Sequence, residues 1–122
     1  MLQEKSSNSV KVLSINYEKL ILKLKEIAKE IKRRDSKVKK IILFGSFAKG
    51  NFTPESDLDI LIIVSKAKEK FLFRSENYID FFKNIPLDIN IIVYTEAEVE
   101  KFLNQKNFFI GEILKNNINL LD

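Results

Sequence analysis

Three aspartates occupy positions from which their carboxylates could bind a metal ion. Asp57 and Asp59 are two residues apart at the start of an aliphatic run, so they share one face of a predicted strand, about 6 to 7 Å apart along it. If the strand that carries Asp88 lies beside this one with the same face exposed, Asp88 joins them. Carboxylate oxygens suit Mg²⁺ or Mn²⁺ better than a softer metal. The pattern therefore predicts a site for a hard divalent cation.

A glycine and a serine precede these acids in a position suited to holding phosphate. Gly45 and Ser46 follow directly on an apolar run that predicts a strand. Glycine lets the backbone approach a ligand, and backbone amides together with a serine hydroxyl can donate hydrogen bonds to phosphate oxygens. The Gly45-Ser46 turn is therefore a candidate phosphate-binding site.

Strands must position these residues. The aliphatic and β-branched segments 38–44, 56–64 and 87–94 each predict one. In 56–64 the alternation of side chains places the two acids opposite the aliphatic residues Leu58, Ile60 and Ile62. In 87–94 the same alternation places Asp88 opposite its aliphatic neighbours. The three acids can therefore lie on one face of a sheet if the two strands are neighbours.

Helices are predicted on either side of these strands. Apolar residues spaced three and four apart predict amphipathic helices over 16–34 and 67–83. Thr95 followed by Glu98 fits a capping box that begins a third helix, which the region of Asn107 could break in two. The order helix, strand, strand, helix, strand, helix predicts an α/β (α+β) fold, with helices packed against one sheet.

The composition limits the chemistry. The 122 residues suffice for a single domain, 1–122, of which 1–13 are expected to form a flexible N-terminal segment. The absence of His and Cys excludes zinc fingers, Ser-His-Asp hydrolysis and cysteine nucleophiles. The run Ile60 to Val64 is far too short to span a membrane, and we expect a cytoplasmic protein. The net charge of +4 is mild and does not require a nucleic-acid partner.

Taken together, Gly45-Ser46, ten residues, and Asp57-Leu58-Asp59 resemble the signature of the DNA polymerase β-like nucleotidyltransferase superfamily. The similarity extends beyond the signature. The stretches GSFAKGNFTPESDLDILIIV and LDINIIV are similar to the minimal nucleotidyltransferases (MNT proteins) that pair with HEPN proteins, and the resemblance covers almost the whole chain. It implies the polymerase β-like fold, a small mixed sheet with helices packed against it.

The resemblance also implies a role for each site residue. Gly45 and Ser46 would hold the β- and γ-phosphates of a nucleoside triphosphate, and Asp57 and Asp59 would bind two metal ions. Asp88 would be the third carboxylate, binding the metal that activates the attacking hydroxyl; a solvent-facing residue at the start of its strand is the alternative. The family usually has Arg where this chain has Lys49, which keeps the charge but loses the two-pronged hydrogen-bonding geometry.

The activity implied by the resemblance is transfer of AMP from ATP, with Mg²⁺ or Mn²⁺, to a hydroxyl of another protein. The acceptor would be a tyrosine of a HEPN-domain toxin, which would make this chain the antitoxin of a HEPN–MNT pair and a member of a hetero-oligomer. Two alternatives stay open: a non-catalytic module that neutralises its toxin by occlusion, and a nucleotidyltransferase acting on a small molecule.

Two surface features have both ordinary and functional interpretations. The basic cluster from Lys32 to Lys40 could bind nucleic acid, but cations also favour the C-terminal end of a helix, and we favour the solvated interpretation. The ten Phe residues exceed what the predicted helices need, with Phe73, Phe81 and Phe108 outside the main apolar faces. A cluster of exposed aromatic side chains would mark a partner surface, whereas scattered ones would be unremarkable surface residues.

Overall fold

The chain forms a four-stranded mixed sheet in the order β3-β2-β1-β4. The computed structural model describes the backbone of residues 9–122 and the side chains of residues 16–122. Neighbouring strands differ in direction: β1 is antiparallel to both β2 and β4, whereas β2 and β3 are parallel. This arrangement confirms the predicted fold class. The strands are β1 (Val38–Phe44), β2 (Leu58–Val64), β3 (Ile89–Thr95) and β4 (Ile118–Asn119).

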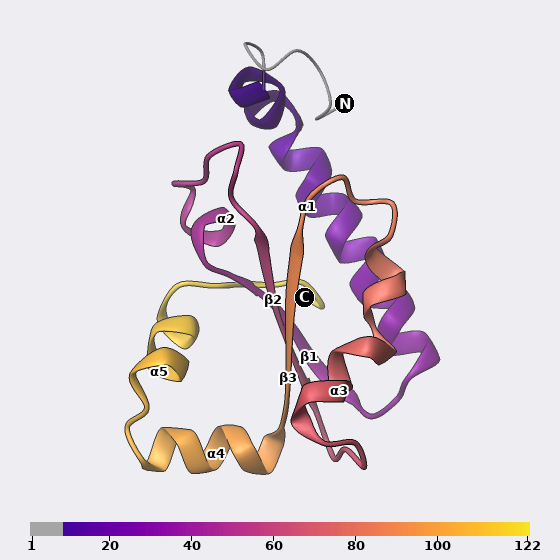
Figure 1. Ribbon diagram of the computed structural model, residues 1–122, viewed down its shortest axis with the longest axis vertical. Helices are drawn as coiled ribbons and strands as arrows, with labels where there is room; N and C mark the ends of the chain where they lie inside the picture. Colours follow the sequence, from indigo (N-terminus) through magenta and orange to yellow (C-terminus); the bar gives the residue numbers. More distant parts are fainter. Residues whose placement is uncertain (1–8) are drawn as a thin grey trace.

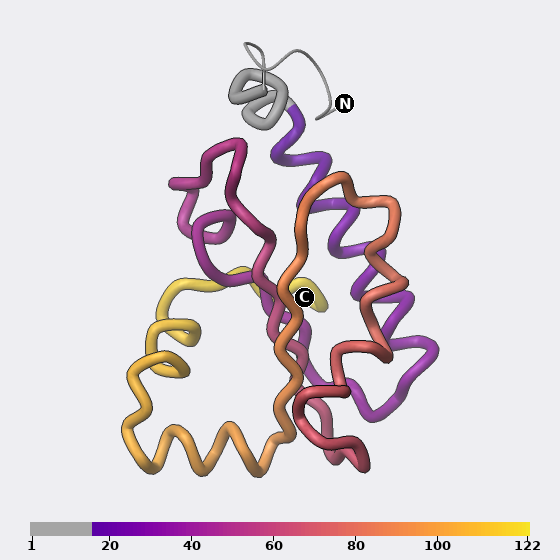
Figure 2. The backbone as a smooth tube through the Cα atoms, in the orientation of Figure 1, coloured from indigo at the N-terminus to yellow at the C-terminus, as the bar shows by residue number. Residues whose placement is uncertain are grey.

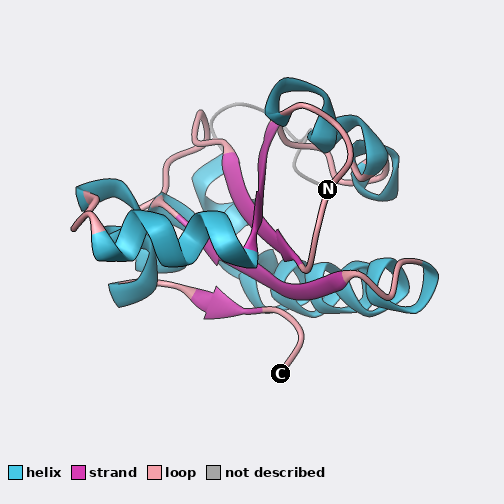
Figure 3. Ribbon diagram, turned by 90° about the horizontal axis from the view of Figure 1, so that it is seen from below, coloured by secondary structure: helices cyan, strands magenta, loops and turns pink. Residues whose placement is uncertain are grey.

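Helices cover both faces of the sheet, as Figure 1 shows. The long helix α1 (Ser9–Arg34) and the segment between β2 and β3 pack on one face. Helices α4 (Glu96–Asn104) and α5 (Phe108–Lys115) lie on the other. In Figure 3 the strands run between these helices. The candidate site residues lie at or beside the ends of β1, β2 and β3.

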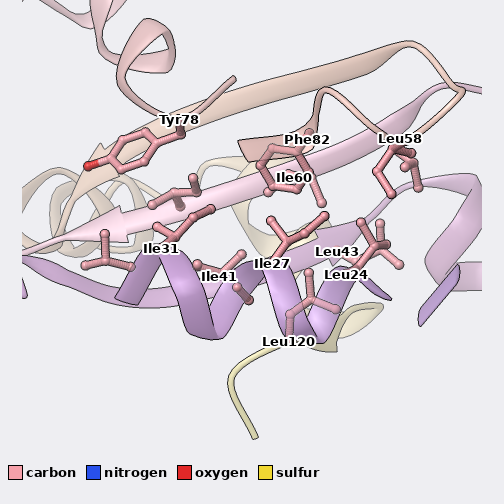
Figure 4. Close-up of a cluster of buried hydrophobic side chains, with 14 of the residues drawn as sticks. Leu24, Ile27, Ile31, Ile41, Leu43, Leu58, Ile60, Tyr78, Phe82 and Leu120 are labelled. Carbon is pink, nitrogen blue, oxygen red and sulfur yellow. The ribbon is translucent and has the colours of Figure 1, made fainter. Parts of the chain in front are cut away.

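The side chains of β1 alternate between two hydrophobic clusters. Ile41 and Leu43 face α1, whereas Ile42 and Phe44 face the side of α5. Burial on both faces explains why β1 and β2 are nearly continuous aliphatic runs rather than alternating ones. The larger cluster, where α1 packs on the sheet, is drawn in Figure 4. Residues labelled there include Leu24, Ile27, Ile31, Ile60, Phe82 and Leu120.

The N-terminal helix is longer than the sequence pattern predicts. Helix α1 begins at Ser9, so residues 9–13 belong to it, and the flexibility of the segment 1–13 stays a prediction. The remainder of that segment, 1–8, lies outside the described residues. The apolar stripe that predicts the helix starts later because it records the residues that contact the sheet.

No helix in the described part of the chain is long and apolar enough to cross a membrane.

The helix predicted over 67–83 is wrong as a continuous element. The chain instead forms three short turns: α3 (Phe71–Arg74), η2 (Ser75–Asn77) and η3 (Ile79–Phe82). Tyr78 separates the last two with a φ of −124°, outside the helical range. The buried side chains recur about every four residues, which imitates a helix, but contacts to distant elements fix each turn separately. Tertiary packing has therefore overridden the local pattern.

The chain after β3 follows the predicted capping box and then breaks. The hydroxyl of Thr95 accepts the Glu98 amide (3.1 Å), and the Glu98 carboxylate accepts the Thr95 amide (2.8 Å), so α4 begins where the sequence predicts. Asn107 caps α5 by accepting the Ile110 amide (3.0 Å), which divides the third helix in two. Figure 2 shows the chain then returning to the centre of the molecule, where β4, which the sequence does not reveal, pairs with β1.

Arg74 connects the segment between β2 and β3 to the far side of the sheet. It is 8% exposed, and its guanidinium donates to both carboxylate oxygens of Glu98 (2.7 and 3.1 Å) and to the carbonyl of Val93 (3.2 Å). Its Nε donates to the carbonyl of Glu69 (3.1 Å). The bond to Arg74 lowers the pKa of Glu98 below its ordinary value. One side chain thus holds α3, β3 and α4 together.

Three cations of the basic cluster, Lys32, Arg33 and Arg34, form contacts within the protein. Arg33 and Arg34 both bind the carboxylate of Glu30 (2.6 and 2.7 Å), and the ammonium of Lys32 donates to the carbonyl of Val38 (2.6 Å). All three lie in the last turn of α1, where positive charge also complements the helix dipole. Lys32 therefore ties the end of α1 to β1, and the solvated interpretation of the whole cluster stays a prediction.

Replacing Arg74 with methionine should destabilise the fold by about 1 to 3 kcal/mol, because the Glu98 carboxylate and the Val93 carbonyl would lose their donor. The lower half of this range is expected, since Glu98 is about one-third exposed and water can replace part of the loss. Urea denaturation measures the difference. As a control, Arg33→Met removes an exposed ion pair with Glu30 and should leave the denaturation midpoint unchanged. Equal midpoints for Arg74→Met and the wild type would contradict the stabilising role of Arg74.

The same ion pair predicts a pH dependence of stability. The folded-state pKa of Glu98 is lowered, so the ionised carboxylate adds to the stability of the fold. This added stability is fully present above the ordinary pKa of 4.5 and is lost as the pH falls through the folded-state pKa. Arg74 stays charged throughout. The free energy of unfolding should therefore decrease in acid less steeply for Arg74→Met than for the wild type, which urea titrations at several pH values would show.

Candidate active site

The parallel pairing of β2 with β3 gathers a polar cluster at one end of the sheet. The register places Asp59 beside Asn90. The Asn90 amide nitrogen donates to Asp57 (Oδ2, 3.2 Å) and to Asp59 (Oδ1, 3.1 Å). Side-chain alternation puts these residues on the same face as Leu61 and Ile63, the face that α4 and α5 cover. One amide therefore spans both carboxylates and keeps them side by side.

The two carboxylates differ in environment. Asp57 is exposed, whereas Asp59 is partly buried, and this loss of hydration raises the pKa of Asp59. The hydrogen bond from Asn90 lowers the pKa of Asp59, and the nearby charge of Asp57 raises it. A cation beside both groups would relieve their repulsion. Two adjacent carboxylates form an all-oxygen donor set, so the pair fits the hard divalent cation that the sequence predicts.

Gly45 lies directly against this pair. It follows Phe44, the β1 residue that pairs with Asp59, and it has a φ of +76°, a conformation that residues with a side chain rarely adopt. A β-carbon at Gly45 would collide with the Asp59 carboxylate oxygen Oδ2. The glycine is therefore required twice, for the turn after β1 and for the close approach of the backbone to the carboxylate.

The turn after Gly45 is a single helical turn anchored by aromatic packing. Helix α2 (Ser46–Lys49) begins at Ser46, and its Phe47 is fully buried. Phe47 stacks on Phe52 (4.5 Å between ring centroids), Phe52 stacks on Tyr17 (5.4 Å), and the Tyr17 hydroxyl donates to the Phe47 carbonyl (2.7 Å). These contacts hold the glycine–serine turn rigidly between α1 and the carboxylates.

The Asp59 side of the cluster opens into a hollow of about 370 Å³. One wall carries the glycine turn and the ammonium-bearing Lys49 of α2, and the other carries aromatic rings from β1 and α5. Three of the predicted site residues, Gly45, Lys49 and Asp59, therefore meet in one cavity. Its lining includes Phe44, Gly45, Lys49, Asp59, Phe108 and Phe109.

Asp88 lies on the other side of the cluster. Its carbonyl accepts the Leu58 amide (2.9 Å), which extends the parallel pairing beyond the strands, and its exposed side chain lines a second, open hollow of about 630 Å³ together with Glu55, Ser56 and Asp57. Among the described residues, no three acidic side chains are arranged as one metal-binding group. The role of Asp88 as the third ligand, like that of Ser46 in holding phosphate, stays a prediction.

Sequence reasoning missed the residue that bridges the two acids. Alternation places Asn90 on the same face as Asp88, so either could reach Asp57 and Asp59, and only the register of β2 against β3 selects Asn90. It also missed the aromatic wall from α5, because Phe108 lies outside the apolar stripe of that helix. The available signal in the sequence is an aromatic residue outside the apolar stripe, and such a residue does not show where in the fold its side chain will lie.

Comparisons with known proteins agree with this geometry. A model of the nucleotidyltransferase domain family matches residues 24–118. Two curated proteins of Methanocaldococcus jannaschii, each named "Putative protein adenylyltransferase", are 34% identical to this chain. The first aligns over 93 residues, 75% of this chain and 83% of the relative, and the second over 92 residues, 66% and 88%.

Solved structures share the fold at lower sequence identity. A Sulfolobus solfataricus structure described as "a putative nucleotidyltransferase" has a TM-score of 0.59 at 23% identity and covers 84% of this chain and 80% of that one. A toxin–antitoxin complex with AMP-PNP gives 0.55 at 18%, covering 79% and 71%. A tri-AMPylated Shewanella oneidensis HEPN toxin in complex with MNT antitoxin gives 0.51 at 18%, covering 81% and 69%. On its family match and its curated relatives, the chain belongs to the nucleotidyltransferase domain family, with the polymerase β-like fold that its sequence signature indicates.

Proposed function

We propose that this protein transfers AMP from ATP to a tyrosine hydroxyl of a HEPN-domain toxin and so acts as the antitoxin of a HEPN–MNT pair. The observation that carries the proposal is the pair Asp57 and Asp59, joined by Asn90, with Asp59 against the Gly45 turn. Support for a protein acceptor comes from the names of the curated relatives, and support for a toxin partner comes from the toxin–antitoxin complexes that share the fold.

The residues of the Gly45 turn would hold the donor. The backbone amides after Gly45, the Ser46 hydroxyl and the Lys49 ammonium can bind triphosphate oxygens, while Asp57 and Asp59 hold the divalent cation. When bound, Mg²⁺ or Mn²⁺ neutralises negative charge that would otherwise keep the phosphates away from the two aspartates. The burial of Phe47 keeps this turn in place, so binding the donor needs little reorganisation.

The transfer itself is an in-line displacement. The acceptor oxygen forms a bond to the α-phosphorus, the bond from that phosphorus to the oxygen bridging to the β-phosphate breaks, and pyrophosphate leaves with its electron pair. The hydroxyl proton passes to solvent in the open hollow on the acceptor side. We assign Asp88 to that side, because it lines the open hollow beyond Asp57, where its negative charge favours loss of the hydroxyl proton.

Asp57→Asn and Asp59→Asn should each abolish transfer while the protein stays folded, because a neutral side chain of equal size removes a metal ligand but little packing. Transfer is measured with ATP labelled at the α-phosphate, Mg²⁺ and a HEPN-domain toxin. Mg²⁺ with ATP should also raise the melting temperature of the wild type, by the equivalent of about 2.7 kcal/mol at a hundredfold excess over Kd, and much less in either variant.

Asp80→Asn is the matched control, an exposed acid outside the two hollows that should change neither transfer nor melting. Undiminished transfer in both active-site variants would refute the catalytic assignment. Toxin neutralisation by the wild type, without incorporation of label and without a melting shift from Mg²⁺ and ATP, would identify a module that acts by occlusion.

Asp88→Asn should separate donor binding from chemistry. The donor is held on the other side of the cluster, so Mg²⁺ and ATP should still raise the melting temperature of this variant, whereas incorporation of label into the acceptor should fall sharply because the hydroxyl is no longer activated. Rates like those of the wild type would place Asp88 among ordinary surface residues, and loss of the melting shift would place it with the donor instead.

Gly45→Ala should lose transfer more severely than Ser46→Ala. The new methyl group would displace the Asp59 carboxylate, whereas the serine variant loses one hydrogen bond to a charged group, about 1.5 to 3 kcal/mol. Gly50→Ala is the matched control, since Gly50 also has a positive φ, +83°, but open space around its α-carbon. It should cost some stability and keep transfer. The opposite order of transfer rates for the two glycine variants would show that the contact with Asp59 is unimportant.

A further inference from the structure

The hollow beside Asp59 has walls of different chemistry. Gly45 and Lys49 form one side of it, Phe44, Phe108 and Phe109 form an aromatic side, and Glu112 and Asn116 also line it. The turn after β1 carries Gly45 and Lys49, and α5 carries Phe108 and Phe109, so the two walls meet beside the end of β1. A ligand whose phosphates lie against the polar wall would therefore have its remaining part directed along an aromatic one.

The aromatic wall combines a fixed ring with an open one. Phe109 packs edge-on against Phe44 (5.9 Å between centroids, 85° between planes), and Phe44 is itself buried in the sheet. Phe108 is 80% exposed, the most exposed of the large hydrophobic residues in the described part of the chain. The start of α5 that carries both is held by the Asn107 cap and by the buried Ile110. A rigid helix thus presents an unpaired aromatic side chain at the cavity.

The second hollow lacks such a wall. Its lining is Pro54, Glu55, Ser56, Asp57, Ile85, Pro86, Leu87 and Asp88, which includes three acids and no aromatic ring. Nucleobases stack favourably on aromatic side chains whatever their sequence, and negative charge would repel the phosphates attached to them. Of the two hollows beside the aspartates, the aromatic one is therefore suited to the nucleoside.

We infer that Phe108 and Phe109 form the platform on which the base of the donor nucleotide stacks, which makes Phe108 a specificity-determining residue for nucleotides over bare polyphosphate. This inference rests on the proposed function, since it takes the phosphates to lie at Gly45 and Lys49. It assigns the acidic hollow to the acceptor. An aromatic side chain that solvent would otherwise surround thereby gains a partner when the donor binds.

The absence of tryptophan from this chain allows a direct test. In the full-length variant Phe108→Trp, ATP with Mg²⁺ should quench the single indole fluorescence by stacking, whereas tripolyphosphate with Mg²⁺ should bind and leave it unchanged. Phe73→Trp is the matched control: Phe73 is also exposed, at 53%, but lies on α3, away from the hollow. Its fluorescence should respond to neither ligand.

Calorimetry supplies the second measurement. Phe108→Ala should weaken binding of ATP by about tenfold or more and leave binding of tripolyphosphate unchanged, while Phe73→Ala should alter neither. Because Phe108 is exposed, its truncation does not threaten the fold. Equal ATP affinities for Phe108→Ala and the wild type, with no quenching of Phe108→Trp, would overturn the platform and leave the proposed function standing. Failure of the wild type to bind either ATP or tripolyphosphate would overturn both.

Discussion

The register of the parallel pair β2 and β3 is the constraint on which the site depends. Side chains alternate along a strand, so a slip of one residue would turn Asn90 away from Asp59 and put an aliphatic side chain in its place. The register is secured by burial on both faces, since Leu61 and Val93 lie in different clusters on opposite faces of the sheet. Core packing therefore determines where the carboxylates stand, and the carboxylates contribute little to that choice.

A second constraint acts through the antiparallel pair β1 and β2. Phe44 pairs with Asp59, so the chain leaves β1 just as β2 begins, and the turn at Gly45 must pass the carboxylate closely. Only a residue without a β-carbon can do so. Stacked rings behind the turn, Phe47 and Phe52, then fix its position from the opposite side. The glycine of the signature is thus explained by packing inside the protein as well as by the approach of a phosphate.

The segment between β2 and β3 shows how distant contacts can override local pattern. Its buried residues Arg74, Tyr78 and Phe82 recur every four positions, as in a helix. The polar ends of the first two are bonded elsewhere, Arg74 to Glu98 and Tyr78 to Asp35 (2.8 Å), and burial together with this hydrogen bond raises the pKa of Tyr78 above its ordinary value. These anchors divide the segment into separate turns that no periodicity in the sequence could foretell.

By itself, the sequence determined the strands β1, β2 and β3, the capping box at Thr95, and the signature that places Gly45, Ser46, Asp57 and Asp59 in a nucleotidyltransferase, because aliphatic runs, caps and short spacings are local properties. Tertiary structure alone decided what lies beside these residues. Asn90 rather than Asp88 bridges the two acids, the two-residue strand β4 forms, and Phe108 lines the hollow at Asp59. Each of these depends on which segments far apart in the chain become neighbours, and that is set by the register and burial of the whole sheet.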